Sequence, residues 1–234
     1  WNYNGQAIAI SAYNLRAQAG GNVYIENYNR DVAIVGNNYA AGGTYALSAY
    51  SSSIINGYGT ITANYAQLYA DNDIGTSGNH IQTSVNYLNA QARGYDSDGN
   101  VYITNNQSVT TVGDNYATGG TFSLTTTNGG NINLGSSLYG GGHITANNIS
   151  LDASGTINDW VQDGTLSANT VTLRATDIGS DSTVYTRTSN LVATATDGSI
   201  YINNHSYGDA YVTLNATNNV YLDNYDGDVK IVDA

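Results

Sequence analysis

Acidic residues are the strongest candidates for chemistry in this chain of 234 residues. Asp71 and Asp73 form one closely spaced pair, and Asp96 and Asp98 form another. Two such carboxylates can act as the acid and the base of a glycan-cleaving enzyme when a basic side chain lies beside them. Arg93, near Asp96 and Asp98, makes the best such grouping. Turn aspartates more often cap exposed backbone amides, and we favour that interpretation, so we expect no catalytic residue and no enzyme.

Two acidic segments, 96–100 and 223–228, resemble fragments of calcium-binding loops. The carboxylates in them are Asp96, Asp98, Asp223, Asp226 and Asp228. Neither segment completes an EF-hand loop with its terminal Glu, and the Gly-rich calcium nonapeptide is absent. Calcium is therefore a weak alternative, and we expect no metal site and no cofactor.

The three histidines give no sign of a shared site. His80, His143 and His205 lie in unrelated sequence contexts, without a second His or a carboxylate at ligand spacing. Metal sites and catalytic histidines need such partners. We therefore expect the three side chains to face solvent from loops.

Tyrosine is unusually frequent, with 21 copies. Tyr24, Tyr102, Tyr201 and Tyr221 each stand between two apolar residues, so in a strand they should point outward. Tyr201 and Tyr221 are close enough in sequence to stack on successive turns of a repeat. Two interpretations stay open: Tyr is a good strand former at exposed sites, or these residues form an aromatic stripe for sugars or self-association.

The elements that carry these residues are predicted to be short strands. Apolar residues alternate with outward ones in many triplets, such as Val23-Tyr-Ile25, Val101-Tyr-Ile103 and Ile200-Tyr-Ile202. Alternation with period two indicates half-buried strands, and Gly, Asn and Asp between the triplets favour turns. No window has a sustained helical period, so we expect an all-β fold.

Several sequence phrases recur along the chain. Residues 23–35 return as 220–232, with related phrases at 99–105 and 198–204, while 37–49 match 114–126 and 68–92 match 173–195. Repetition of this kind is typical of a solenoid, whose stacked rungs offer the same environment. Rungs of roughly 20 residues predict about a dozen of them and a rod of about 55 Å at ~4.8 Å per rung. The Asp-Ile-Gly motifs at 73–75 and 177–179 should each place Ile in the core and Gly where a side chain would be hindered.

Composition narrows the function. Six basic and eighteen acidic residues give a net charge of −12. Proteins that bind nucleic acid or anionic lipid carry basic surfaces, so the composition argues against both kinds of partner. No apolar run is long enough to span a bilayer, so we expect no membrane insertion. Cys, Met and Pro are absent and the composition is uniform. These features favour one solenoid domain over residues 1–234, located outside the cell.

Several phrases resemble the filamentous haemagglutinin family, large secreted exoproteins of Gram-negative bacteria. The resemblance rests on GTITA at 59–63 with QLYA at 67–70, on GHITANNISLDA at 142–153, and on the Asp-Ile-Gly motifs. It implies a right-handed parallel β-helix, two-partner secretion through an outer membrane, and a role in adhesion, aggregation or matrix. The chain would be an internal piece of the shaft. It departs from the family in lacking proline and in its many tyrosines.

The sequence therefore predicts an extracellular structural and adhesive β-solenoid, part of a bacterial surface adhesin or a biofilm fibre. Neither end shows a polar cap, so we expect each end to continue into more solenoid, covalently or by head-to-tail stacking of copies. Surface glycans are a second expected partner. The alternative is a polysaccharide-binding or polysaccharide-cleaving β-helix, which exposed aromatics and paired carboxylates would serve.

Overall fold

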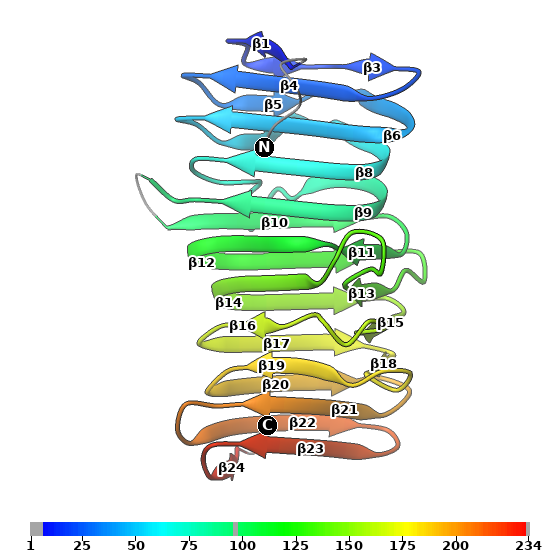
Figure 1. Ribbon diagram of the computed structural model, residues 1–234, viewed down its shortest axis with the longest axis vertical. Helices are drawn as coiled ribbons and strands as arrows, with labels where there is room; N and C mark the ends of the chain where they lie inside the picture. The colour runs from blue at the N-terminus through cyan, green and yellow to red at the C-terminus, as the bar shows by residue number, and fades with distance from the viewer. Residues whose placement is uncertain (1–6, 96–97, 233–234) are drawn as a thin grey trace.

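Short parallel strands stack side by side along one long axis, so the molecule is a rod (Figure 1). The structure, a computed structural model, describes residues 7–95 and 98–232. Within these ranges the chain forms strands and no helix, which confirms the predicted all-β class. Accordingly, no helix in the described part of the chain is long and apolar enough to cross a membrane.

The strands follow one another as β1 (Ile8–Ile10), β2 (Asn14–Leu15), β3 (Gln18–Ala19), β4 (Val23–Tyr28), β5 (Val32–Ile34), β6 (Asn37–Tyr50), β7 (Ile54–Asn56), β8 (Thr60–Ala70), β9 (Ile81–Ala92), β10 (Gly99–Asn105), β11 (Val109–Thr111), β12 (Gly113–Thr126), β13 (Ile132–Leu134), β14 (Gly142–Ala153), β15 (Thr156–Asn158), β16 (Leu166–Ser167), β17 (Thr170–Ala175), β18 (Asp177–Ile178), β19 (Val184–Arg187), β20 (Asn190–Ala195), β21 (Ile200–His205), β22 (Ala210–Ala216), β23 (Val220–Tyr225) and β24 (Val229–Ile231).

Equivalent positions of successive rungs lie beside one another. Leu47 pairs with Ile25 on one side and with Leu68 on the other, all in parallel strands. The chain makes about 10 rungs, roughly 22 residues apart, slightly fewer and longer than the sequence predicts. In Figure 1, β21 and β23 run from right to left at the front while the chain descends, as in a right-handed coil. The predicted parallel β-solenoid is confirmed.

The core is a continuous column of small apolar side chains along the rod. Val101 and Ile103 are fully buried, whereas Tyr102 between them lies half-buried on the outside. Ile200 and Ile202 flank Tyr201 in the same way. A slip of one residue would turn every side chain to the opposite face, so this alternation fixes the register of each rung.

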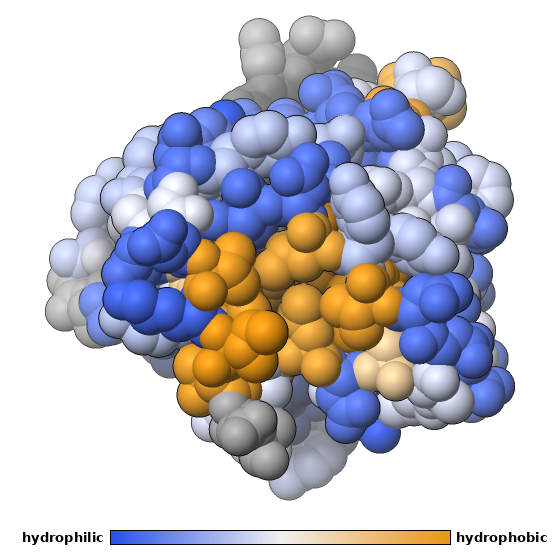
Figure 2. All heavy atoms as spheres, turned by 90° about the horizontal axis from the view of Figure 1, so that it is seen from below, coloured by the Kyte–Doolittle hydropathy of each residue, from blue (hydrophilic) through white to orange (hydrophobic). Residues whose placement is uncertain are grey.

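Val220 and Leu222, the apolar residues on either side of Tyr221, lie on the last described rung. Val220 is 49% exposed and Leu222 is half-buried. Both point inward, but among the described residues no later rung covers them. Together with Val212, Leu214, Val229 and Ile231 they line an open apolar hollow of about 470 Å³. Figure 2 shows this surface from below as an apolar patch, with polar residues to its left, above it and to its right.

The long repeats of the sequence are structural equivalents. β6 and β12 each have 14 residues and the same break in pairing register, after Ala40 and after Ala117. After each break the backbone N–H of a threonine donates to the side chain of an asparagine in the preceding rung. Asn22 accepts a hydrogen bond from the Thr44 N–H at 2.8 Å, and Asn100 accepts one from the Thr121 N–H at 2.9 Å.

The two Asp-Ile-Gly motifs occupy equivalent corners, as predicted. Ile74 and Ile178 are fully buried and bridge to Val101 and Ile200 of the next rung. Each following glycine has positive φ, 72° at Gly75 and 70° at Gly179. A Cβ at either glycine would collide with a backbone carbonyl oxygen of the next rung, that of Tyr102 or that of Tyr201. The prediction for both motifs is confirmed.

Candidate functional site

A tyrosine-rich surface covers the rod near its C-terminal end, where three adjacent strands present their outward side chains. In β19 and β21 every second residue points away from the core, and β23 pairs with β21 residue by residue and so presents its side chains in the same order. We call this surface the tyrosine face. Its members are Tyr185 and Arg187 from β19, Tyr201, Asn203 and His205 from β21, and Tyr221, Asp223 and Tyr225 from β23.

Parallel pairing arranges these side chains in columns along the rod. Tyr201 lies beside Tyr221, and their rings stack with centroids 6.4 Å apart at an interplanar angle of 29°. The predicted stacking of these two tyrosines is confirmed. His205 lies beside Tyr225 in the same pair of strands, with ring centroids 6.4 Å apart.

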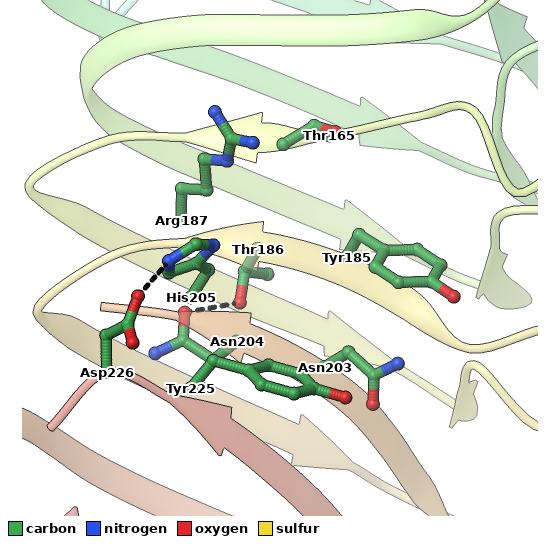
Figure 3. A pocket seen from close by; sticks show the side chains of 9 residues that line it. All are labelled: Thr165, Tyr185, Thr186, Arg187, Asn203, Asn204, His205, Tyr225 and Asp226. Carbon is green, nitrogen blue, oxygen red and sulfur yellow. Dashed lines mark hydrogen bonds and ion pairs between the residues drawn. The ribbon is translucent and has the colours of Figure 1, made fainter. Parts of the chain in front are cut away.

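A groove of about 490 Å³ runs across the tyrosine face (Figure 3). It is lined by Thr165, Tyr185, Thr186, Arg187, Asn203, Asn204, His205, Tyr225 and Asp226. Its floor is closed by the buried pair Thr186 and Asn204, whose side chains are hydrogen-bonded at 2.8 Å. In Figure 3 the rings of Tyr185 and Tyr225 lie to the right, and the charged side chains lie to the left.

The polar side chains of the groove are held by local partners. His205 Nε2 lies 2.6 Å from Asp226 Oδ2. The Tyr225 hydroxyl donates to Asp223 at 2.9 Å, and this hydrogen bond raises the pKa of Tyr225. Tyr225 therefore stays protonated at neutral pH. Rings beside amide, guanidinium and imidazole groups can stack on sugar rings and bond to their hydroxyls.

Tyr24 and Tyr102 lie outside the tyrosine face. Both point outward, as predicted, but Tyr24 pairs with Ala46 and Tyr102 pairs with Ser123. The Tyr102 ring contacts His80, with centroids 5.6 Å apart. The four predicted tyrosines therefore do not form one stripe; only Tyr201 and Tyr221 come together.

The aspartates considered as a catalytic pair cap backbone amides of neighbouring rungs. Asp71 accepts from the Ser51 N–H at 2.7 Å and from the Tyr69 hydroxyl at 2.7 Å. Asp73 accepts from the Asn100 N–H at 2.8 Å. The capping interpretation is confirmed for both residues.

Arg93, the basic residue of the grouping considered from the sequence, contacts two tyrosine rings. The Arg93 guanidinium lies over the rings of Tyr69 and Tyr95, 5.4 and 5.8 Å from their centroids. The Asp98 carbonyl oxygen accepts from the Asn100 side chain at 3.0 Å. Asp96 lies outside the described residues.

The calcium candidates near the C-terminal end have partners within the protein. The Asp223 carboxylate accepts a hydrogen bond from the Tyr225 hydroxyl, and the Asp226 carboxylate pairs with His205. The backbone carbonyl oxygen of Asp228 accepts a hydrogen bond from the Ala210 N–H at 2.8 Å. Among the described residues no group of three or more His, Cys, Asp or Glu is placed to hold a metal ion.

The expectation that the histidines lie in loops is correct for His80, which precedes β9, but wrong for His143 and His205. His143 lies within β14 and His205 ends β21, so neither is a loop residue. His205 has a carboxylate partner, Asp226, which comes from the next rung. His80 is half-buried, with its Nδ1 3.0 Å from Thr104 Oγ1, and burial lowers its pKa.

A second aromatic cluster, in the N-terminal half, was not predicted. Tyr28 and Tyr50 stack with centroids 5.0 Å apart at 25°, and Tyr69 follows at 5.6 Å from Tyr50. Arg93 continues the stack. The sequence signal was the Tyr that ends the strand in two successive rungs, at 28 and at 50.

Buried asparagines at rung corners were also missed. Asn27, Asn105 and Asn204 are fully buried, and each lies two residues after the repeated Val/Ile-Tyr-Ile triplet. Each side chain accepts a hydrogen bond from a backbone N–H of the preceding rung, that of Ala12, Val85 and Thr188 respectively. The signal was the constant Asn at the end of each phrase.

Comparison with known proteins does not extend this picture: no protein-family model, no curated protein and no solved structure matches the chain.

Proposed function

We propose that this chain is a structural segment of an extracellular β-solenoid, the shaft of a secreted bacterial adhesin or of a biofilm fibre. The proposal includes continuation of the rod into further solenoid at its ends. The observation that carries it is the stack of about 10 equivalent parallel rungs around one continuous apolar core.

The rest of the molecule supports a mechanical role. Rungs pair in parallel along the length of the rod, and the fully buried large side chains are almost all aliphatic. The absence of Cys and Met and the small number of Lys and Arg suit a protein exposed to oxidants and proteases. The resemblance to filamentous haemagglutinins adds two-partner secretion from a Gram-negative cell to the proposal.

Labelling of intact cells tests this function. Antibodies raised against the purified chain should stain intact cells of the source organism, or material released from them, as strongly as permeabilised cells. An antibody against a cytoplasmic protein is the control for cell integrity. Staining that requires permeabilisation would overturn the proposal.

A second candidate function, polysaccharide binding, is favoured by the tyrosine face. The stacked pair Tyr201 and Tyr221 lies on the same three strands as the groove between Tyr185 and Tyr225. Binding to acidic and neutral polysaccharides, measured by affinity electrophoresis, should weaken in Tyr201→Ala and Tyr225→Ala. The matched control is Tyr24→Ala, outside the face. Equal binding by all variants would exclude this site, and steady release of reducing sugar would point to a cleaving enzyme instead.

A further inference from the structure

Three tyrosine hydroxyls donate hydrogen bonds to carboxylates that lie two residues away in sequence. Tyr28 donates to Glu26 at 2.7 Å, and Tyr69 donates to Asp71 at 2.7 Å. Tyr225 makes the third such bond. An ionised carboxylate can only accept hydrogen bonds, so each phenol proton points at a group that can receive it. This arrangement assists oxidation, because a tyrosine that loses an electron also loses its hydroxyl proton.

Two of these three tyrosines belong to the aromatic stack of the N-terminal half. Tyr28 of β4 and Tyr50 of β6 are direct neighbours in parallel strands. Their ring centroids lie 5.0 Å apart and the ring planes differ by 25°. Tyr69 continues the stack at 5.6 Å from Tyr50. A radical formed on one ring therefore has a second phenol in contact with it.

Exposure distinguishes the two ends of the stack. Tyr28 is 37% exposed, whereas Tyr69 is 5% exposed. The Tyr69 ring also contacts the Arg93 guanidinium, 5.4 Å from the ring centroid. An oxidant that acts at the protein surface therefore reaches Tyr28 and is kept from Tyr69. The pair formed by Tyr28 and Tyr50 is the reactive part of the stack.

The composition makes tyrosine a principal target of oxidants in this chain. Cys and Met are the side chains that oxidants usually modify, and the sequence has neither of them. It has 21 tyrosines and two tryptophans instead. No thiol or thioether of the chain competes for the oxidant, so an exposed phenol with a proton acceptor beside it is favoured.

We propose that Tyr28 and Tyr50 form a site of oxidative modification, at which a haem peroxidase with hydrogen peroxide joins the two rings as dityrosine. Each phenol loses one electron and one proton, and Glu26 receives the proton of Tyr28. One carbon–carbon bond forms between ring positions ortho to the hydroxyls, and the two ortho hydrogens then move to the oxygens. The peroxide takes up the two electrons and two protons and becomes two molecules of water.

The product would be a covalent bond between adjacent rungs. Tyr28 and Tyr50 lie on neighbouring strands, which are about 4.8 Å apart, and exposed side chains change rotamer within nanoseconds. The rings can therefore turn from the stack to bring their ortho carbons together. This inference adds a modification to the molecule and does not rest on the proposed function.

Other tyrosine contacts provide a comparison within the same chain. Tyr201 and Tyr221 are also stacked neighbours, and Tyr87 lies 4.8 Å from Tyr139. Within the described residues none of these four hydroxyls bonds to a carboxylate. Tyr221 is 52% exposed, more than Tyr28. Exposure alone would therefore favour the pair Tyr201 and Tyr221, whereas the carboxylate favours Tyr28 and Tyr50.

The experiment treats the purified 234-residue chain with a haem peroxidase and limiting hydrogen peroxide. Size-exclusion chromatography then isolates the monomer, so that any cross-link in it lies within one chain. Trypsin cleaves after Arg16, Arg30 and Arg93, which puts Tyr28 in peptide 17–30 and Tyr50 in peptide 31–93. Mass spectrometry should find these two peptides joined with the loss of two hydrogens. Their yield should exceed that of a cross-link between Tyr201 and Tyr221.

Conservative variants identify the groups involved. Tyr28→Phe and Tyr50→Phe should each abolish the joined peptide, whereas Tyr24→Phe, in the same tryptic peptide as Tyr28, should preserve it. Glu26→Gln removes the proton acceptor and should lower the yield severalfold. Circular dichroism checks that each variant keeps the fold of the parent chain.

The matched control for Glu26→Gln is Asp223→Asn, which removes the carboxylate beside Tyr225 and should leave the yield of the joined peptide unchanged. Absence of this peptide from the oxidised monomer would overturn the site. An equal or higher yield at Tyr201 and Tyr221, or an unchanged yield in Glu26→Gln, would overturn the selection by the carboxylate.

Discussion

Asn105 and Val85 are joined by two hydrogen bonds that cross from one rung to the one before it. The Val85 N–H donates to Asn105 Oδ1 at 2.9 Å, and Asn105 Nδ2 donates to the Val85 carbonyl oxygen at 3.1 Å. The same amide donates to the Gln107 carbonyl oxygen at 2.9 Å. One fully buried side chain therefore closes the turn of its own rung and fixes the height of the neighbouring rung.

Asn105→Ala should lower the free energy of unfolding by about 3 kcal/mol, because several buried polar groups lose their partners at once. The measurement is the midpoint of urea unfolding followed by circular dichroism. Asn86→Ala is the matched control: Asn86 is exposed and bonds to Asn64 at 3.0 Å, so its loss should stay below about 1 kcal/mol. Equal effects of the two changes would contradict a special role for the buried amide.

Ile103→Asp should destabilise the rod by more than about 4 kcal/mol, since it places an unpaired charge in a dry core. Ser123→Asp, on the neighbouring strand but facing outward beside Tyr102, should cost less than about 1 kcal/mol. Thermal unfolding of both variants distinguishes the two faces. A tolerated Ile103→Asp would show that the interior is hydrated.

Gly75→Val and Gly179→Val should each cost at least about 2 kcal/mol, and by similar amounts. Both glycines have positive φ and approach a carbonyl oxygen of the next rung, and a β-branched residue fits neither condition. Gly78→Val is the control in the same loop, because a Cβ there meets no atom within 4 Å. Unequal urea midpoints for the two motif variants would mean that the two corners are not equivalent.

Acidification should weaken the fold through His80. Its pKa is lowered by burial, so the unfolded chain binds a proton near the ordinary value of about 6.5 while the folded chain does not. The free energy of unfolding should therefore fall as the pH drops below about 6.5, towards the lowered pKa of the folded state. Urea midpoints at pH 7.5 and 5.5 measure this loss. His80→Gln should reduce it, whereas an equal reduction in His143→Gln would contradict the assignment.

The core and the corners were predictable because their signals are local. Val101 and Ile103 flank an outward Tyr102 within three residues, and this alternation alone defines a strand and its buried face. Gly75 and Gly179 were predictable for a related reason. The same short motif occurs twice, and a repeated glycine implies a repeated backbone requirement.

Contacts between rungs were less predictable because the length of a rung varies. Leu47 pairs with Leu68, but Phe122 pairs with Ile149, several residues further along the chain. A loop inserted in one rung shifts every later neighbour. The pairing of His205 with Asp226 therefore had no signal in the spacing of the two residues.

Buried asparagines were missed because Asn is mostly an exposed turn residue. Asn27, Asn105 and Asn204 follow apolar triplets, where a turn is expected, and each does precede a turn. These side chains are buried because each accepts a hydrogen bond from a backbone N–H of the neighbouring rung. A contact between rungs cannot be read from the sequence of one rung alone.

The stacked rungs also make the folded molecule much shorter than its extended chain. One rung advances the rod by about 4.8 Å, yet it contains roughly 22 residues, which extend to about 75 Å when pulled straight. Each rung is held mainly by its two neighbours, so tension applied at the ends would peel rungs away one after another. A cell or fibre tethered through such a rod would yield to a sudden load in steps, with more than tenfold extension before the chain itself is taut.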